Sequence, residues 1–277
     1  MALTGSSILR KTLTMVLAGG IGERLYPLTL ERTKPSVPFG GKYRIIDFAL
    51  SNCLNSGLRK IYVLTQYKSD SLNRHLYEAW NIFNPELGEF IYSIPPQLKI
   101  SNNWYQGTAN AIRQNFNLIY DEDYEWIVLL SGDHIYKMDY LKMIQYHIET
   151  GAQLTISNME MPKTVSDRFG CIEVDAEFRV QNFVEKPKSP PTIPGNPEMS
   201  FVNMGVYVFS RSVLKDVILQ MEKEKLKNND FGQDVIPYMI KNQYKVMAYQ
   251  FFDENKKDQP YWIDVGTIDS YYAASMD

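Results

Sequence analysis

The sequence predicts an α/β fold, in which a mostly parallel mixed sheet is flanked by helices and the second half of the chain is richer in strands. Two observations support this prediction. Short apolar runs alternate with segments of helical periodicity as far as Gly151, and strand-like runs predominate beyond that glycine. Because alternating strands and helices build right-handed βαβ units, we expect the first half to form the parallel part of the sheet.

The elements of the first half follow from their apolar patterns. Three short apolar runs are typical of buried strands: Leu13–Leu17, Lys60–Thr65 and Trp126–Leu130. Three segments with apolar residues at helical spacing are expected to be helices: Asp47–Asn55, Thr108–Ile119 and Asp139–Glu149. Gly57 and Gly151 follow the first and the third of these segments, and glycine commonly ends a helix.

The second half contains more strand-like runs than helical ones. Its expected strands are Leu154–Asn158, Cys171–Val174, Val180–Val184 and Val202–Phe209. Its expected helices are Arg211–Leu219 and Gln233–Ile240. The proline-rich stretch at residues 188–197 is expected to be a surface loop. We therefore expect a substrate-binding lobe built onto the same sheet rather than an independent domain.

The composition excludes several classes of protein. Of the 277 residues, 44% are hydrophobic and 22% are charged, which is typical of a folded globular chain. The 29 basic and 32 acidic residues give a net charge of −3, which argues against a dedicated nucleic-acid binder. A small phosphate ester remains possible as a ligand, because a few well-placed cations suffice to bind it.

The two cysteines, Cys53 and Cys171, lie in apolar stretches, and the sequence has no CxxC motif or Cys/His cluster. Buried free thiols are therefore expected, which fits a reducing compartment. The sequence has no apolar run of about 18 residues, the length that a membrane span requires. Residues 1–12 lack the apolar region of a secretory signal. These observations predict a cytoplasmic protein without a membrane span.

A glycine-rich loop, Ala18–Leu25, follows the first expected strand. Its backbone N–H groups are suited to phosphate oxygens, although an ordinary tight turn explains the glycines equally well. The loop matches neither the dinucleotide fingerprint GxGxxG nor a Walker A loop. Arg24 within the loop and Lys34 ten residues later favour the phosphate interpretation, because a guanidinium and an ammonium together can neutralise a triphosphate.

A carboxylate is expected near this loop. Asp133 follows the buried strand Trp126–Leu130, and ligands of α/β sheets collect at the carboxyl ends of strands. Magnesium prefers one or two carboxylates together with water and phosphate oxygens, so Asp133 is a candidate metal ligand. The alternative for Asp133 alone is a turn or a helix N-cap. His75, His134 and His147 receive no catalytic role, because no two of them form a metal-binding or catalytic pair.

Motifs along nearly the whole chain resemble those of the sugar-1-phosphate nucleotidylyltransferases, and most closely those of the glucose-1-phosphate adenylyltransferases. The resemblance begins with the glycine-rich loop and Lys34-Pro35, and is most specific at residues 39–57. It continues through residues 65–67, 104–109, 132–136, 183–187, 203–209 and 261–267. The resemblance implies the Rossmann-like fold of nucleotide-diphospho-sugar transferases, with a nucleotide-binding half at about residues 1–135 and a sugar-phosphate-binding half at about residues 136–277.

The resemblance implies that ATP and α-D-glucose 1-phosphate react to give ADP-glucose and pyrophosphate, for glycogen or starch synthesis. In-line attack at the α-phosphorus asks mainly for positioning and charge neutralisation, with Mg²⁺ as the cofactor. One alternative is a sister enzyme that uses dTTP, UTP or GTP. Another is a regulatory subunit that binds sugar nucleotide without turnover. The presence of Arg24, Lys34 and Asp133 favours an active enzyme.

The resemblance also assigns the site residues. Catalytic roles fall on Arg24, Lys34, Asp133 and Lys186, and the metal ligands are Asp133 and Asp264. The nucleotide is expected to contact Leu17, Ala18, Gly19, Gly20, Gly22, Arg24, Gln66, Gly107 and Thr108. Glucose 1-phosphate is expected to contact Tyr105, Gly170, Glu185, Lys186 and Asn203. From the residues alone, the segment at Glu185-Lys186-Pro187 is equally an exposed charged strand end.

The chain departs from the family pattern at three positions. Glu23 replaces a threonine before the loop arginine, Asn110 stands where an aspartate is frequent, and Asn203 stands where many members carry serine. Family members usually continue into a C-terminal left-handed β-helix that helps to build tetramers. Because the chain ends at Asp277, soon after its last motif, the resemblance implies a chain without that domain and leaves homo-oligomer formation open.

Overall fold

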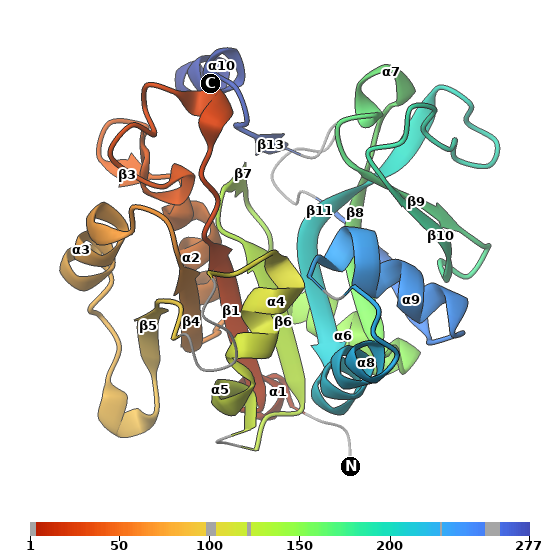
Figure 1. Ribbon diagram of the computed structural model, residues 1–277, viewed down its shortest axis with the longest axis horizontal. Coiled ribbons are helices and arrows are strands. Elements are labelled where there is room, and N and C mark those ends of the chain that lie inside the picture. Colours follow the sequence, from red (N-terminus) through yellow and green to blue (C-terminus); the bar gives the residue numbers. More distant parts are fainter. Residues whose placement is uncertain (1–3, 98–103, 121–122, 228, 253–260) are drawn as a thin grey trace. The chain divides into compact units, whose positions relative to one another are not determined.

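The computed structural model describes residues 4–97, 104–120, 123–227, 229–252 and 261–277 (Figure 1). The chain divides into two units, each made of segments that are distant in sequence. The first unit takes Met1–Trp104, Leu129–Leu141 and Asp253–Asp277, and the second takes Tyr105–Val128 and Lys142–Phe252. No helix within the described ranges is long and apolar enough to cross a membrane.

The first unit is built on a parallel ladder of strands, which lie side by side in Figure 1. Its strands are β1 (Thr12–Ala18), β4 (Lys60–Thr65) and β5 (Phe90–Ile94). The strand β6 (Trp126–Ser131) lies on the other side of β1, and its residues from Leu129 onward belong to this unit. The strands expected at residues 13–17, 60–65 and 126–130 are therefore confirmed.

Helices and two small antiparallel ladders complete the first unit. Its helices are α1 (Gly5–Arg10), α2 (Ile46–Asn55), α3 (Asp70–Ala79) and α10 (Ile268–Met276), with 3-10 turns η1 (Glu23–Leu25), η2 (Lys34–Ser36) and η3 (Pro85–Leu87). The ladders pair β2 (Pro38–Phe39) with β3 (Tyr43–Arg44), and β7 (His134–Tyr136) with β13 (Trp262–Asp264). Gly57 follows the C-cap residue Ser56 of α2 and adopts φ +81, as expected of a helix-ending glycine.

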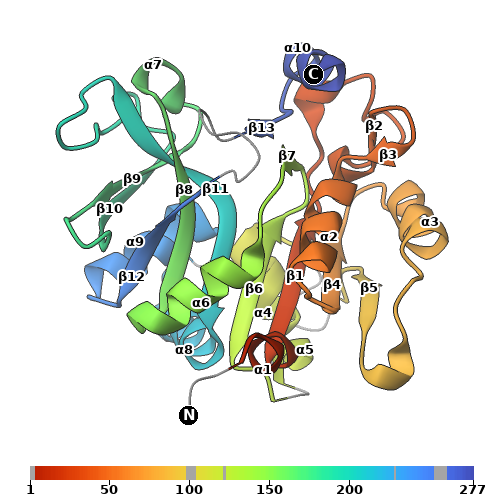
Figure 2. The same ribbon diagram turned by 180° about the vertical axis from the view of Figure 1, so that it is seen from behind.

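The second unit contains a mostly antiparallel sheet in the order β10-β9-β11-β8-β12 (Figure 2). Its strands are β8 (Leu154–Pro162), β9 (Gly170–Val174), β10 (Val180–Glu185), β11 (Met199–Ser210) and β12 (Val246–Gln250). Only β12 and β8 pair in parallel among these strands. The four strands predicted in the second half are confirmed, and so is its β-rich character.

The helices of the second unit correct two expectations. They are α4 (Thr108–Gln114), α5 (Phe116–Tyr120), α6 (Tyr140–Thr150, which begins in the first unit), α7 (Lys163–Ser166), α8 (Arg211–Lys223), the π-helical turn η4 (Phe231–Val235) and α9 (Ile236–Lys241). The single helix expected at residues 108–119 is wrong, because the side chain of Asn115 donates to the Ala111 carbonyl where the helix breaks. The helix expected at residues 233–240 begins instead as a π-helical turn, which Asp230 caps at its start.

The two units do not coincide with two consecutive halves of the chain. Residues 105–128 belong to the second unit, and the last segment returns to the first. The last segment returns to the first unit because its strand β13 pairs with β7, which directly follows the loop after β6. The assignment of nucleotide and sugar phosphate to residues 1–135 and 136–277 stays a prediction. Cys53 and Cys171 are buried free thiols, as expected.

Candidate active site

The glycine-rich loop after β1 is held in the first unit by close contacts that leave little room for side chains. Gly22 adopts φ +69, and a Cβ atom there would lie 2.9 Å from the Cβ of Lys34. A Cβ atom at Gly19 would lie 3.1 Å from the Cβ of Gln66. The Thr33 hydroxyl donates to the Gly20 carbonyl at 2.9 Å, and this hydrogen bond also holds the loop in place. Gly19 and Gly22 are therefore favoured by this local packing, whereas a Cβ atom at Gly20 would meet no atom within 4 Å.

Lys34 is a buried cation at the centre of this region. Its side chain is 8% exposed, and its Nζ lies 3.0 Å from Oδ2 of Asp133 and 2.7 Å from Oδ1 of Asp264. Lysine is rarely buried unless it is paired, and here two carboxylates pair with it. The structure thus brings together three residues that the sequence singled out.

The two aspartates meet because of the small β7–β13 ladder. Asp133 lies between β6 and β7, and Asp264 pairs in register with His134 on the neighbouring strand. A hydrophobic cluster supports both strands and the η2 turn; it contains Val37, Phe39, Ile45, Ile135, Val265 and Ala274. Val265 directly follows Asp264, so the packing of this cluster fixes where that carboxylate lies.

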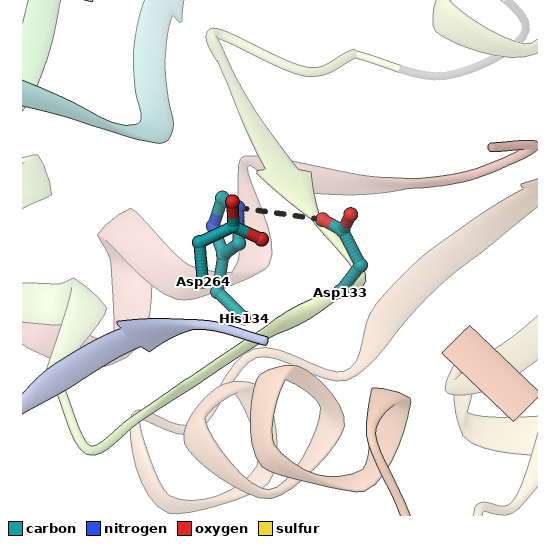
Figure 3. Close-up of side chains that lie close together, drawn as sticks. All are labelled: Asp133, His134 and Asp264. Carbon is teal, nitrogen blue, oxygen red and sulfur yellow. Dashed lines mark ion pairs between the residues drawn. The ribbon is translucent and has the colours of Figure 1, made fainter. Parts of the chain in front are cut away.

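His134 lies beside the two carboxylates, and Figure 3 shows its contact with Asp133. Its Nε2 lies 3.5 Å from Oδ1 of Asp133, and ligand atoms of Asp133, His134 and Asp264 lie within 4.8 Å of one another. His134 was expected to have no catalytic role, because no second histidine forms a metal-binding or catalytic pair with it. Its place in the group follows from strand pairing, which the sequence motif does not show.

The charges of this group shift the pKa values of its members. Burial alone would raise the pKa of Asp133, but His134, Lys34 and a hydrogen bond from the Ser131 hydroxyl outweigh it, and the pKa lies well below its usual value. Burial would lower the pKa of Lys34, but the two carboxylates outweigh it and raise that pKa. The lowered pKa of Asp133 and the raised pKa of Lys34 keep this carboxylate and this ammonium charged at neutral pH.

Arg24 reaches the same group from the glycine-rich loop. Its side chain is exposed, and a Cβ atom on Gly266 would lie 3.0 Å from Arg24 Nη2 and 2.9 Å from Asp264 Oδ2. Gly266 therefore lets the arginine approach the Asp264 turn. An exposed guanidinium beside a buried ammonium and N–H-rich backbone can hold phosphate oxygens.

The second unit contains all five residues expected to bind the sugar phosphate. Glu185, the last residue of β10, pairs in register with Gly170 of β9. A Cβ atom at Gly170 would lie 2.8 Å from Glu185 Oε2, and a Cβ atom at Gly232 would lie at the same distance. The backbone of Gly170 in β9 and that of Gly232 in the turn η4 thus both pack closely against the Glu185 carboxylate.

Lys186 lies in a turn at the end of β10. It adopts φ +49, and its backbone N–H donates to the Phe169 carbonyl at 3.0 Å. This turn brings neighbouring side chains together, with Lys186 Nζ 3.4 Å from Glu185 Oε1. Lys186 is 65% exposed, so its ammonium is available to an anion. The turn predicted before Pro187 is confirmed, and the roles of both charges stay predictions.

Asn203 and Tyr105 take part in hydrogen bonds within the second unit. Asn203 Nδ2 donates to the Tyr207 hydroxyl at 2.6 Å, and Asn203 Oδ1 accepts from the Gly205 N–H at 3.0 Å. Asn115 Nδ2 donates to the Tyr105 hydroxyl at 2.9 Å. Carboxylates of Glu185 and Asp230 lie close enough to Tyr207 to add to the effect of burial in raising the pKa of its hydroxyl.

Gly107 and Thr108, expected to contact the nucleotide, are tied to the start of η4. A Cβ atom at Gly107 would lie 2.2 Å from the Asn229 carbonyl oxygen. The Thr108 hydroxyl donates to Asp230 Oδ2 at 3.1 Å and accepts from the Phe231 N–H at 3.0 Å. These contacts give both residues a structural role, and their nucleotide contact stays a prediction.

Asn110 and Glu23, two positions at which the chain departs from the family pattern, lie in different surroundings. Asn110 is buried, and its Oδ1 accepts from Gln114 Nε2 at 2.8 Å and from the Gln106 N–H at 3.2 Å. These bonds use only the carbonyl oxygen of Asn110, and a carboxylate would also accept them. Glu23 is exposed at the start of η1.

Sequence reasoning missed Thr33, Asp230, Gly232 and Gly266. Gly266 lies two residues after Asp264, so its proximity to a candidate ligand was a usable signal. Asp230 and Gly232 flank the start of a π-helical turn, a feature frequent at functional sites that apolar periodicity does not reveal.

Comparisons with known proteins agree with the geometry. A family model described as nucleotidyl transferase matches residues 13–277. The chain is 51% identical over 267 residues to glucose-1-phosphate adenylyltransferase 2 of Vibrio vulnificus (strain CMCP6), a match covering 96% of this chain and 66% of the relative. It is 48% identical over 272 residues to glucose-1-phosphate adenylyltransferase of Methylococcus capsulatus, covering 98% of this chain and 64% of that relative. The chain thus spans slightly less than two thirds of these relatives.

Proposed function

The chain belongs to the nucleotidyl transferase family, and from this premise we propose that it transfers the adenylyl group of ATP to α-D-glucose 1-phosphate, giving ADP-glucose and pyrophosphate. The observation that carries the proposal is the buried Lys34 ammonium between Asp133 and Asp264, beside a glycine-rich loop and Arg24. The choice of ATP and glucose 1-phosphate is supported by the names of the similar proteins.

The reaction is an in-line displacement at the α-phosphorus of ATP. A phosphate oxygen of glucose 1-phosphate forms the new bond to this phosphorus, and the bond from the α-phosphorus to the bridging oxygen of pyrophosphate breaks. The electron pair of the broken bond leaves with pyrophosphate. Proteins assist such transfers mainly by positioning the reactants and neutralising charge. Arg24 and Lys34 suit the leaving pyrophosphate, since both are cations beside the glycine-rich loop.

The residues present fit Mg²⁺. Asp133 and Asp264 supply the hard carboxylate oxygens that this ion prefers, within the same group of nearby ligand atoms. When bound, the ion stabilises negative charge on the reacting phosphoryl groups. Lys34 pairs with both carboxylates and offsets one of their two negative charges, so its ammonium and a cation share one set of oxygens.

The sugar phosphate is assigned to the second unit. The exposed Lys186 ammonium is suited to its phosphate, and the Glu185 carboxylate to sugar hydroxyls. Asn203 and Tyr105 offer further hydrogen-bonding groups there. Gly170 removes the side chain that would otherwise cover Glu185.

A nucleotide panel tests the proposed function. We expect pyrophosphate release with ATP to exceed that with dTTP, UTP or GTP, and to require both glucose 1-phosphate and Mg²⁺. A preference for another nucleotide would point to a sister enzyme. A chain that binds ADP-glucose but releases no pyrophosphate with any nucleotide would contradict catalysis and indicate a regulatory subunit.

Replacement of Lys186 by alanine is expected to raise the KM for glucose 1-phosphate about 10-fold or more, because a charge-assisted hydrogen bond to its phosphate is lost. The KM for ATP should change little, since the lysine is assigned to the other substrate. Initial rates of pyrophosphate release, with each substrate varied in turn, measure both constants. Lys188→Ala is the matched control, an exposed lysine two residues away. An equal rise in both KM values for Lys186→Ala would contradict its assigned role.

A further inference from the structure

One buried side chain of the second unit has no hydrogen-bond partner for either of its polar atoms. Asn158 of β8 is fully buried, and both Nδ2 and Oδ1 of its carboxamide are without a partner among the described residues. A carboxamide can make four hydrogen bonds, so leaving all of them unmade costs stability. Such groups in folded proteins require an explanation, and a functional role is one of them.

The position of Asn158 in the sheet indicates what this group is for. Asn158 pairs in register with Asn203 on β11, so the two side chains lie on the same face of neighbouring strands. The same register places Gln250 of β12 on the other side of Asn158. Three amide side chains thus form one row across three strands, and Asn203 is the member assigned to the sugar phosphate.

The hydrogen bonds of Asn203 leave room for a further partner. Its Nδ2 donates one bond to the Tyr207 hydroxyl, and its Oδ1 accepts one from the Gly205 N–H. One N–H and one lone pair of the Asn203 carboxamide remain for other groups. Asn158 carries the complementary donor and acceptor directly opposite.

We propose that Asn158 is a positioning residue of the sugar site, whose carboxamide pairs with that of Asn203 when the sugar phosphate binds and so directs Asn203 toward a sugar hydroxyl. This inference rests on the proposed function. Asn158 does not touch the substrate, because its side chain is fully buried. Pairing with Asn203 gives the Asn158 carboxamide hydrogen-bond partners in the complex, which makes substrate binding stronger.

Asn158→Leu tests this inference, because it keeps a branched side chain and removes both polar atoms. We expect the KM for glucose 1-phosphate to rise about 5-fold, as for the loss of one neutral hydrogen bond, with kcat and the KM for ATP changed less than about 2-fold. We also expect Tm to rise, since an unpaired buried polar group is removed. In an Asn203→Ala background the leucine variant should have no further effect on KM.

Thr14→Val is the matched control. Thr14 of β1 is also fully buried, and its hydroxyl has no partner within the described parts of the chain. Its replacement should raise Tm in the same way but leave both KM values unchanged. If Asn158→Leu does not fold, the variants Asn158→Ala and Asn158→Ser replace it in the test, since they differ by one hydroxyl group. A smaller KM for glucose 1-phosphate in the serine variant than in the alanine variant would support the inference.

The outcomes separate this inference from the proposed function. An active parent chain with an unchanged KM in Asn158→Leu would overturn the inference alone and indicate an internal water as the partner of Asn158, especially if Tm falls. Equal KM values for the alanine and serine variants, or a full effect of Asn158→Leu in the Asn203→Ala background, would also overturn it. A parent chain that releases no pyrophosphate would overturn both.

Discussion

Replacement of Asp133 by asparagine is expected to lower kcat about 100-fold to 10,000-fold, because the variant loses a carboxylate assigned to hold Mg²⁺ against the reacting phosphoryl groups. Folding should be much less affected. Lys34 keeps Asp264 as a partner at 2.7 Å, so no buried charge is left unpaired. Initial rates of ADP-glucose synthesis and of pyrophosphorolysis, with a thermal unfolding curve of each protein, measure the two effects.

Asp139→Asn is the control for this prediction. Asp139 is exposed, and its Oδ1 accepts from the Leu141 N–H at the start of α6, a bond that asparagine also makes. This variant should retain the parent kcat and Tm. Equal pyrophosphorolysis rates for Asp133→Asn and the parent chain would remove Asp133 from the mechanism.

Most of the fold could be predicted from apolar patterns, because its central strands are fully buried runs bounded by loops. β4 begins and ends at the residues expected, β1 is longer than expected by one residue at each end, and β6 is longer by one residue at its C-terminal end. β5 was missed, since this half-exposed edge strand has a mixed apolar and polar pattern. The helix α3 was missed as well. The short strands β7 and β13 could not be predicted, because their pairing joins residues more than a hundred positions apart.

The candidate site was predictable where its chemistry is contained in one motif. Lys34 and Asp133 were expected from local patterns and Asp264 from the family resemblance, and the structure brings all three together. Their mutual contact was not expected, since Lys34 was assigned to pyrophosphate rather than to the carboxylates. The position of the ammonium depends on β7–β13 pairing and on a buried cluster of apolar side chains, neither of which a motif contains.

In the second unit, the residues missed by sequence reasoning act through backbone geometry. Gly232 approaches Glu185 only because η4 turns there, and Asp230 caps that turn. Asn158 lies in an apolar strand pattern, so the sequence gives it no role, and only the strand register places it opposite Asn203. A site assembled by register and tight turns is thus only partly visible in the sequence.

Replacement of Lys34 by methionine is expected to lower kcat/KM for ATP about 100-fold or more, because a preorganised cation next to the triphosphate is lost. The same change leaves Asp133 and Asp264 without their shared ammonium, so their negative charges repel each other. We therefore expect a lower Tm in EDTA and a larger rise in Tm on addition of millimolar Mg²⁺ than the parent chain gives, both without nucleotide. Methionine preserves the length of the side chain, which limits the loss of packing.

The stability measurement distinguishes two roles for the lysine. If the Lys34 ammonium competes with a divalent cation for the two carboxylates, its removal must tighten cation binding even in the absence of substrates, since the carboxylates gain a partner they otherwise lack. Lys241→Met, at an exposed lysine of α9, should show the parent response to Mg²⁺. A Lys34→Met protein whose Tm responds to Mg²⁺ no more than the parent does would show that the aspartates are not the cation site. The loss of activity would then be due to phosphate binding alone.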